Sequence, residues 1–278
     1  MEKLVSNRDG GMAGTLAGRR RWQMIVTIGS AVLALAALAA VAAAEKPTTV
    51  KAGNVVLTIN GGVTPKALPR NELAPITLNV QGKIASADGT HPPALKEVIV
   101  DTDRNGTIDA RGVPTCKAGQ LEATTTATAE QTCKPAIVGT GTTDVEVQFP
   151  EQAPIQISSK LVAFNGGTKG GTTTIFIHAF LSSPVTAAIV TTVKVSKVKN
   201  GRYGTRSIAS VPKIAGGSGS VTAFSLTFQK KLFAYKGKKH GYLLAKCADG
   251  HFDAEAEAVF ADGTHLGGKI VRACTPKG

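Results

Sequence analysis

The spacing of turn-forming residues constrains the fold of this chain more than any other feature of its sequence. From residue 45 onward, segments rich in Val, Ile, Thr and Phe are interrupted roughly every ten residues by Gly, Pro, Asn or Asp, a spacing typical of antiparallel β proteins. Alternation along three segments predicts shared faces: Ile76, Leu78 and Val80; Ile189, Thr191, Val193, Val195 and Lys197; and Phe224, Leu226 and Phe228. The segment 172–183 is the most apolar, which favours a place at the centre of the sheet.

One segment departs from this pattern. Residues 118–133 are rich in alanine and lack strand alternation, which predicts a short helix over about 122–132, capped by Thr124 or Thr125. We therefore expect an all-β fold, an antiparallel β-sandwich or an incomplete (half) barrel, with one short α-helix near 122–132.

The N-terminal segment has the features of an export signal. The uncharged run 24–44 follows Arg19-Arg20-Arg21 and ends in three alanines, so we expect cleavage after Ala44. If it is not cleaved, this run of 21 residues is long enough to anchor the chain in a membrane. The expected organisation is a signal peptide or anchor over 1–44 and a single β-rich extracellular or cell-surface domain over 45–278.

The expected mature domain is strongly basic. Removing residues 1–44 takes away five of 32 basic and two of 19 acidic residues, which leaves 27 against 17 and a formal charge of +10. Such a charge favours contact with anionic cell-surface polymers or lipid head groups. Nucleic acid is a poor candidate, because aromatic residues are not interleaved with the basic ones and no groove-reading helix is predicted. No feature indicates an oligomer.

All four cysteines lie in the domain, and an even number in an exported protein is typical of disulfides. Three pairings are possible. Proximity in sequence favours Cys116–Cys133 and Cys247–Cys274, each worth about 3 kcal/mol by loop-closure entropy.

The stretch "DTDRNGTID" (101–109) resembles part of a calcium loop, with Asp101, Asp103, Asn105 and Asp109 as candidate ligands. Gly112 stands where such a loop needs a bidentate Glu, and the preceding segment is a predicted strand. A hairpin turn at Asn105-Gly106 with its acids in solvent is the favoured interpretation. We expect calcium binding, if any, to be weak, and no other cofactor.

Signature motifs for catalysis are missing from the sequence. It contains no G-x-S-x-G, no H-E-x-x-H, no P-loop and no G-x-G-x-x-G, so no catalytic or cofactor-binding residue is predicted. His91, His251 and His265 each follow an Asp-Gly turn and would form a metal site only if those turns converged. His178, between Phe176 and Phe180, is predicted to be a hydrogen-bonded core histidine.

The lysines concentrate in two predicted hairpins, over 194–206 and 229–246. Lysines at strand edges block unwanted pairing, and this ordinary role competes with contact to an anionic surface.

Several stretches resemble an uncharacterised family of exported hypothetical proteins from high-GC bacteria: "ADGTHPPALKEVIVDTDRNGTIDARGVPTC", "CKPAIVGTG", "LVAFNGG", "YGTRSIASVPKIAGGSGSVTAFSLTF" and "YLLAKC…FADG…C". They cover most of residues 82–274. The resemblance implies export and a β-rich domain, and it carries no known activity, ligand or catalytic residue.

Three hypotheses for function follow. The first is a non-catalytic secreted or cell-envelope domain with a binding or structural role, directed at anionic surface polymers. The second is a carrier that holds an apolar ligand between sheet and helix. The third is a hydrolase with an unrecognised site. A large apolar cavity would favour the carrier, and a Ser–His contact in a cleft would favour the enzyme.

Overall fold

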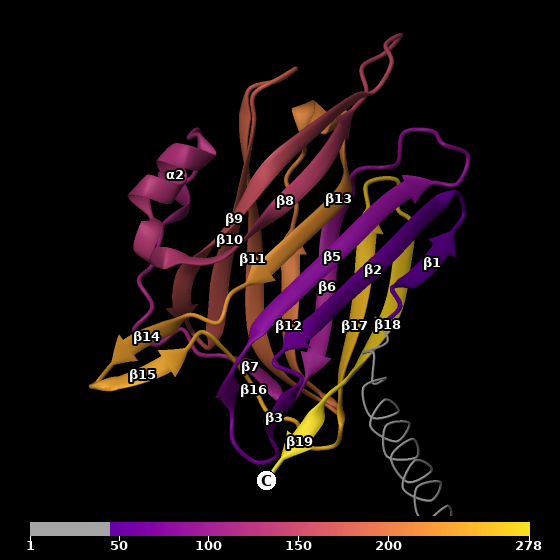
Figure 1. The fold of residues 1–278 in the computed structure, drawn as a ribbon. Coiled ribbons are helices and arrows are strands. Elements are labelled where there is room, and N and C mark those ends of the chain that lie inside the picture. The colour runs from indigo at the N-terminus through magenta and orange to yellow at the C-terminus, as the bar shows by residue number, and fades with distance from the viewer. Residues whose placement is uncertain (1–44) are drawn as a thin grey trace, which may run out of the picture. The chain divides into compact units, whose positions relative to one another are not determined.

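The computed structural model describes residues 45–278, so the expected signal peptide at 1–44 lies outside the described residues. Twelve strands form one antiparallel sheet in the spatial order β1-β2-β5-β13-β8-β9-β10-β11-β12-β6-β17-β18 (Figure 1). Their bounds are β1 Thr48–Ala52, β2 Val55–Thr64, β5 Thr77–Ser86, β6 Leu95–Asp103, β8 Ile137–Val147, β9 Ile155–Lys169, β10 Thr172–Leu181, β11 Ala187–Asn200, β12 Tyr203–Ser210, β13 Gly219–Phe228, β17 His251–Phe260 and β18 His265–Ala273.

The remaining elements are short. The other strands are β3 Ala67–Pro69, β4 Ala74–Pro75, β7 Gly106–Ile108, β14 Leu232–Tyr235, β15 Lys238–Gly241, β16 Leu243–Ala245 and β19 Thr275–Lys277. The helices are α2 Thr126–Thr132 and the single 3-10 turns η1 Ala118–Gln120, η2 Lys134–Ala136 and η3 Ala215–Gly217. The all-β prediction with one short α-helix is confirmed, although the α-helix begins four residues later than expected.

The sheet curls until its first and last strands lie side by side, so that it forms a nearly closed barrel. Within the described residues no backbone ladder joins β1 to β18, and side chains hold the seam. Thr48 Oγ1 donates to Lys269 O over 3.1 Å, and Arg272 Nε donates to Gly61 O over 2.6 Å. Of the two expected architectures, the barrel is the one observed, and it is closed further than a half-barrel.

One end of the barrel is covered by small sheets. The chain leaves β6 at Asp103 and turns into β7, which joins β16 and β4 in a three-stranded sheet. Near the same end the C-terminal strand β19 pairs with β3 in parallel, and β14 pairs with β15 as a separate hairpin (Figure 1). The opposite end consists of the loops that connect the long strands.

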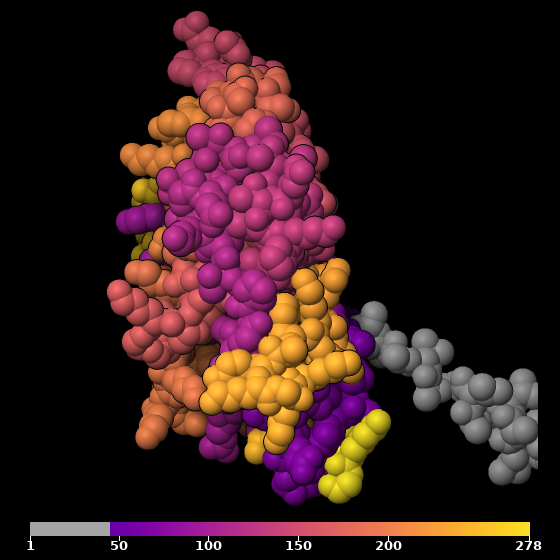
Figure 2. Space-filling model, turned by 90° about the vertical axis from the view of Figure 1, so that its left-hand side faces the viewer, coloured from indigo at the N-terminus to yellow at the C-terminus, as the bar shows by residue number. Residues whose placement is uncertain are grey.

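The helix covers the outer face of β9 and β10. Of the two predicted caps, Thr124 and Thr125, the structure shows Thr125, whose hydroxyl accepts a hydrogen bond from Thr128 N. Beneath the helix, Leu121 and Ala129 pack against Val162 and Phe164. Figure 2 shows this segment as a continuous magenta cover, with the β14–β15 hairpin below it.

This cover explains why β10 is apolar on both faces. The strand is seventh of the twelve in the sheet, so its predicted central place is confirmed. Ile175 and Ile177 point into the barrel, while Phe176 packs on the opposite face under the helix.

His178 is buried under the helix, as predicted. Its Nε2 lies 3.1 Å from Thr124 O and its Nδ1 lies 3.5 Å from Thr126 Oγ1. A neutral ring with its proton on Nε2 satisfies both partners, since a carbonyl only accepts and a hydroxyl can donate. Burial lowers the pKa of His178.

Protonation of His178 therefore favours the unfolded chain, in which an imidazole titrates near pH 6.5. We expect its stability contribution to be complete above that pH and to be lost as the pH falls towards its lower folded pKa. Chemical denaturation between about pH 7 and about pH 5 should show a slope of up to about 1.4 kcal/mol per pH unit from this proton. His178→Gln should remove that slope, whereas the exposed His265→Gln should keep it; equal slopes in both variants would contradict the assignment.

Tyr242 is the largest side chain that is almost fully buried among residues 45–278, and its hydroxyl has no hydrogen-bond partner there. Burial raises its pKa. A buried hydroxyl without a partner costs about 1–3 kcal/mol. We expect Tyr242→Phe to raise the free energy of unfolding by about 1 kcal/mol in urea denaturation, with Tyr235→Phe on the β14–β15 hairpin as the control. A destabilised Tyr242→Phe protein would show that the hydroxyl has a bound partner.

Candidate ligand-binding site

The barrel encloses a cavity of about 440 Å³. Because successive side chains of a strand point to opposite faces, every long strand can contribute alternate residues to this space. The predicted face groups line it together: Ile76, Leu78 and Val80; Ile189, Thr191, Val193 and Val195; Phe224, Leu226 and Phe228. Lys197, predicted to extend the second group, is exposed and does not line the cavity.

The charged side chains of the lining gather at one end. Asp103, Asp253 and Arg272 lie where β6, β17 and β18 meet the end covered by the small sheets. From the middle of the barrel to its other end, the lining is aliphatic and aromatic apart from a few neutral polar groups. The cavity is therefore apolar along its length and polar at its base.

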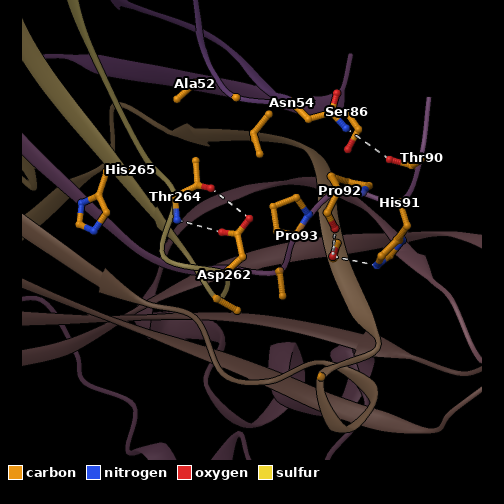
Figure 3. A pocket seen from close by; sticks show the side chains of 16 residues that line it. Ala52, Asn54, Ser86, Thr90, His91, Pro92, Pro93, Asp262, Thr264 and His265 are labelled. Atoms are coloured by element: carbon orange, nitrogen blue, oxygen red, sulfur yellow. Dashed lines mark hydrogen bonds between the residues drawn. The ribbon is translucent and has the colours of Figure 1, made fainter. Parts of the chain in front are cut away.

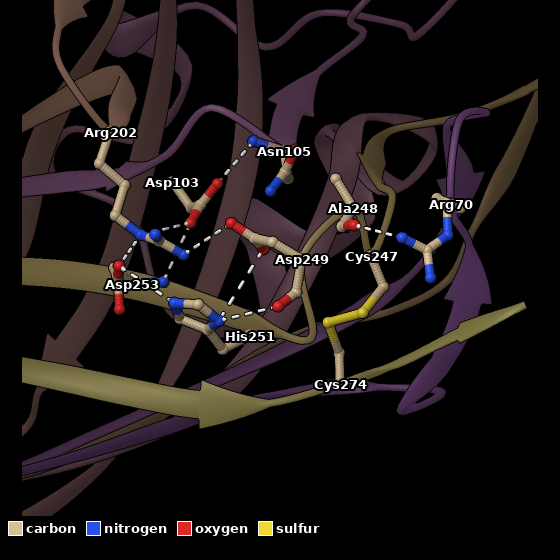
Figure 4. The surroundings of a disulfide bond; sticks show 10 residues. All are labelled: Arg70, Asp103, Asn105, Arg202, Cys247, Ala248, Asp249, His251, Asp253 and Cys274. Carbon is tan, nitrogen blue, oxygen red and sulfur yellow. Dashed lines mark hydrogen bonds and ion pairs between the residues drawn. A yellow bond between two sulfur atoms is a disulfide. The ribbon is translucent and has the colours of Figure 1, made fainter.

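An ion-pair network holds this polar base in place (Figure 4). Arg202 lies 3.3 Å from Asp103 and 3.2 Å from Asp249, and it also contacts Asp253. Burial raises the pKa of Asp103, while the N–H of Asn105 and the guanidinium of Arg202 act in the opposite direction. Three carboxylates of the protein thus share the guanidinium of Arg202 at the base of the cavity.

The space between sheet and helix, where the sequence hypothesis placed an apolar ligand, is filled. Leu121, Ala129, Val162 and Phe164 occupy it with almost no exposed surface. The cavity lies on the other face of the same strands, inside the barrel. The helix therefore covers the outside of the barrel and does not line the site.

At the other end of the barrel, an open pocket of about 800 Å³ lies between the connecting loops (Figure 3). It is lined by the β1–β2 turn, the β5–β6 loop, the β17–β18 turn, Gly217 and Ser220. The repeated "ADGTH" sequence makes the same turn twice here. Asp88 accepts hydrogen bonds from the N–H and hydroxyl of Thr90, and Asp262 does so from Thr264. Asp-Gly turns thus account for the repeat.

The stretch 101–109 is a turn, but it is not the expected hairpin. β6 ends at Asp103 and β7 begins at Gly106, yet β6 pairs with β12 and β17 while β7 pairs with β16. The acids are not in solvent either, because the candidate ligands are all buried: Asp101, Asp103, Asn105 and Asp109. Asp103 Oδ1 instead accepts the N–H of Asn105 and shapes the turn.

Arginines take up the other two carboxylates. Arg206 on β12 binds Asp101 through two hydrogen bonds of 2.8 and 2.6 Å. Arg111 binds Asp109 through two bonds of the same lengths, which lower the pKa of that carboxyl. Bidentate pairs of this kind occupy both oxygens of each carboxylate. In residues 45–278 no group of three or more acidic, histidine or cysteine side chains is arranged to hold a metal ion.

Weak calcium binding at this stretch remains a prediction, and it would require Arg206 and Arg111 to release their carboxylates. We expect a chelator to leave the thermal melting temperature unchanged within about 1 °C, as for a domain with no structural calcium. The control is the double variant Asp101→Asn/Asp103→Asn, whose melting temperature is measured with calcium and with chelator in the same way. Loss of several degrees in chelator, seen in the native chain only, would establish a structural calcium site.

Both predicted disulfides are present. Cys116–Cys133 has a Cα–Cα distance of 5.6 Å, and Cys247–Cys274 has one of 6.0 Å. The first ties the helix to the segment before it, and the second joins the end of β18 to the loop that precedes β17.

The histidines that follow Asp-Gly turns do not converge. His251 lies at the base, near Asp249 and Asp253, whereas His265 contacts Glu257 at the rim of the open pocket. His91 also lines that pocket, but its partners are Ser220 and Glu146. Sequence reasoning missed this contact, since the three residues are 129 and 55 positions apart and form no local motif.

Comparison with known proteins finds no matching family model, no matching curated protein and no matching solved structure. No helix in residues 45–278 has the length and apolar character needed to cross a membrane.

Proposed function

We propose that this protein is an exported carrier that binds an apolar, lipid-like molecule inside its barrel. The observation that supports the proposal is the apolar inner lining around a cavity of about 440 Å³. This volume lies within the range of about 300–1,000 Å³ that is usual for small-molecule sites, which are mostly apolar with a few polar groups.

The distribution of polarity indicates an amphiphilic ligand. Its apolar body would contact Val193, Leu226 and their neighbours, since burying such surface gains about 25 cal/mol per Å². Thr102 and Thr205 lie at the charged end of the lining, where they would contact the neutral polar head of such a ligand. Arg202 already binds both Asp103 and Asp253, so a charged head is not required.

The basic hairpins supply a second element of the proposal, contact with anionic lipid head groups or surface polymers. β11–β12 and β14–β15 both form, with exposed Lys199, Lys236 and Lys238 near their tips. They belong to the end of the barrel covered by the small sheets. Location outside the cell is part of the same proposal, and two disulfides in one domain support an oxidising compartment.

The test is ligand binding by the full exported chain. Organic extraction of purified protein, followed by mass spectrometry, should yield an apolar molecule at close to one per chain. N-phenyl-1-naphthylamine should gain fluorescence on binding with the same stoichiometry, and the extracted molecule or a fatty acid should displace it.

Three outcomes of these measurements distinguish the hypotheses. Probe binding that saturates at one site per chain and is displaced competitively supports an internal site. No extractable molecule together with no saturable probe binding would contradict the carrier. Binding to immobilised anionic polymer without any probe binding would favour the surface-polymer hypothesis in its place.

A further inference from the structure

Three side chains at the open pocket form a hydrogen-bonded series that the proposed carrier role does not use. Ser220 Oγ lies 3.0 Å from His91 Nε2, and His91 Nδ1 lies 2.6 Å from Glu146 Oε1. Ser220 and His91 both line the pocket. A hydroxyl, an imidazole and a carboxylate in this order form the arrangement that activates a serine as a nucleophile.

The fold positions each member from a different element. Ser220 on β13 and Glu146 on β8 are direct cross-strand partners, so their side chains share one face of the sheet. Gln156, the partner of Glu146 on β9, donates to the second carboxylate oxygen and fixes its orientation. His91 comes from the β5–β6 loop, just after the turn that Asp88 and Thr90 stabilise.

The hydrogen bonds select the tautomer that catalysis requires. Glu146 Oε1 can only accept from Nδ1, so the neutral ring carries its proton there and keeps a lone pair on Nε2, towards Ser220. Figure 3 shows His91 beside Pro92 at the edge of the pocket. The carbonyl of Pro92 accepts from Ser220 Oγ over 2.6 Å, so it competes with Nε2 for the hydroxyl proton.

We propose that Ser220, His91 and Glu146 form a catalytic triad that hydrolyses small carboxylic esters bound in the open pocket. Ser220 Oγ forms a bond to the carbonyl carbon of the ester while its proton passes to His91 Nε2. The bond from that carbon to the alcohol oxygen breaks, and the leaving alcohol takes the proton from Nε2. Water then attacks the acyl-serine, its proton returns through His91 to Ser220 Oγ, and the carboxylic acid leaves.

Ser220 is 1% exposed, so the substrate must reach it from the pocket side, where the β5–β6 loop lies over it. This geometry favours short acyl groups and compact reagents. Pro92, Pro93 and Ala94 provide apolar contacts for an acyl chain, while Asn54 and Thr90 lie beside them as polar groups. The proposal is independent of the carrier function, because the pocket and the barrel cavity are lined by different residues.

The first measurement is covalent labelling of the full chain with phenylmethylsulfonyl fluoride, read by intact mass and peptide mapping. We expect one label per chain, on Ser220, and hydrolysis of p-nitrophenyl butyrate by the unlabelled protein. Ser220→Ala and His91→Gln should each lower kcat/KM at least 100-fold, and Glu146→Gln at least tenfold. Ser218→Ala, in the adjacent turn, is the matched control and should keep both labelling and hydrolysis.

Thermal melting of each variant separates catalysis from folding. A Ser220→Ala chain that melts like the native protein but neither reacts nor hydrolyses the ester supports the triad. The proposal is overturned if the folded native chain is not labelled at Ser220, or if hydrolysis persists unchanged in Ser220→Ala and His91→Gln. In either case the hydrogen bonds of Ser220, His91 and Glu146 would only hold the β5–β6 loop against the barrel, and the carrier proposal would be unaffected.

Discussion

Replacement of Cys247 and Cys274 by alanine is expected to lower the free energy of unfolding by about 3.5 kcal/mol. The bond closes a loop of 27 residues, and removing it returns that loop-closure entropy to the unfolded chain. For a domain of this size the melting temperature should fall by roughly 10 °C. The loss should be large because the loop contains the whole β17–β18 hairpin, which forms one side of the barrel seam.

The local contacts indicate where the loss will be felt. Cys274 N donates to Gly250 O, and Thr275 N donates to Lys66 O, so the disulfide lies beside the β19–β3 pairing. Hydrogen exchange should therefore accelerate in β18 and β19 before it accelerates elsewhere.

Cys116→Ala/Cys133→Ala is the matched comparison. Its loop of 17 residues predicts a loss of about 3 kcal/mol, with faster exchange in α2 and not at the seam. Urea denaturation of both variants measures the losses. If the Cys247/Cys274 variant unfolds at the native midpoint, side-chain contacts alone hold the seam and the disulfide does not stabilise it.

The parts of this fold that could be predicted are those fixed by neighbouring residues. Alternation placed Phe224, Leu226 and Phe228 on one face because a strand has a period of two, whatever its partners are. The helix cap could be narrowed to Thr124 or Thr125 because capping depends on a residue three positions away. The two disulfides could be predicted because the cysteines of each pair lie close together in the sequence.

Barrel closure depends on pairings that no local pattern encodes. β6 pairs with β12 and β17, which follow it by roughly one hundred residues or more, and register between distant strands is set by packing of the complete barrel. The "DTDRNGTID" stretch shows the consequence. Its turn was predictable, but the pairing of Asp101 with Arg206 was not, so acids expected in solvent are buried in ion pairs.

The candidate sites divide in the same way. The apolar residues of the cavity were predictable as inward faces, but the fact that they surround a space was not. The Ser220–His91–Glu146 series joins β13, the β5–β6 loop and β8, and it carries no sequence signature because its members lie far apart in the sequence.

Filling the barrel is expected to abolish high-affinity ligand binding. Thr191 and Ser207 line the cavity from β11 and β12, so Thr191→Trp/Ser207→Trp would place two indole rings in the space that we assign to the ligand. Forcing a ligand into an overpacked apolar site costs about 1–3 kcal/mol or more. We expect the Kd for N-phenyl-1-naphthylamine to rise by about tenfold to one hundredfold.

The alternation of β-strands provides a matched control on the same two strands. Thr192 and Ser210 are register partners on the outer face, and neither lines the cavity. Thr192→Trp/Ser210→Trp adds the same two rings outside the barrel and should leave the Kd within about twofold. Thermal melting without ligand should show both variants folded, since the inner rings enter existing space and the outer ones lie outside the barrel, at half-buried Thr192 and exposed Ser210. Equal Kd values for the inner and outer variants would place the probe outside the barrel, and the carrier proposal would then fail. A selective loss in the inner variant would locate the ligand against the inward faces of β11 and β12, because both variants carry the same two substitutions on the same two strands.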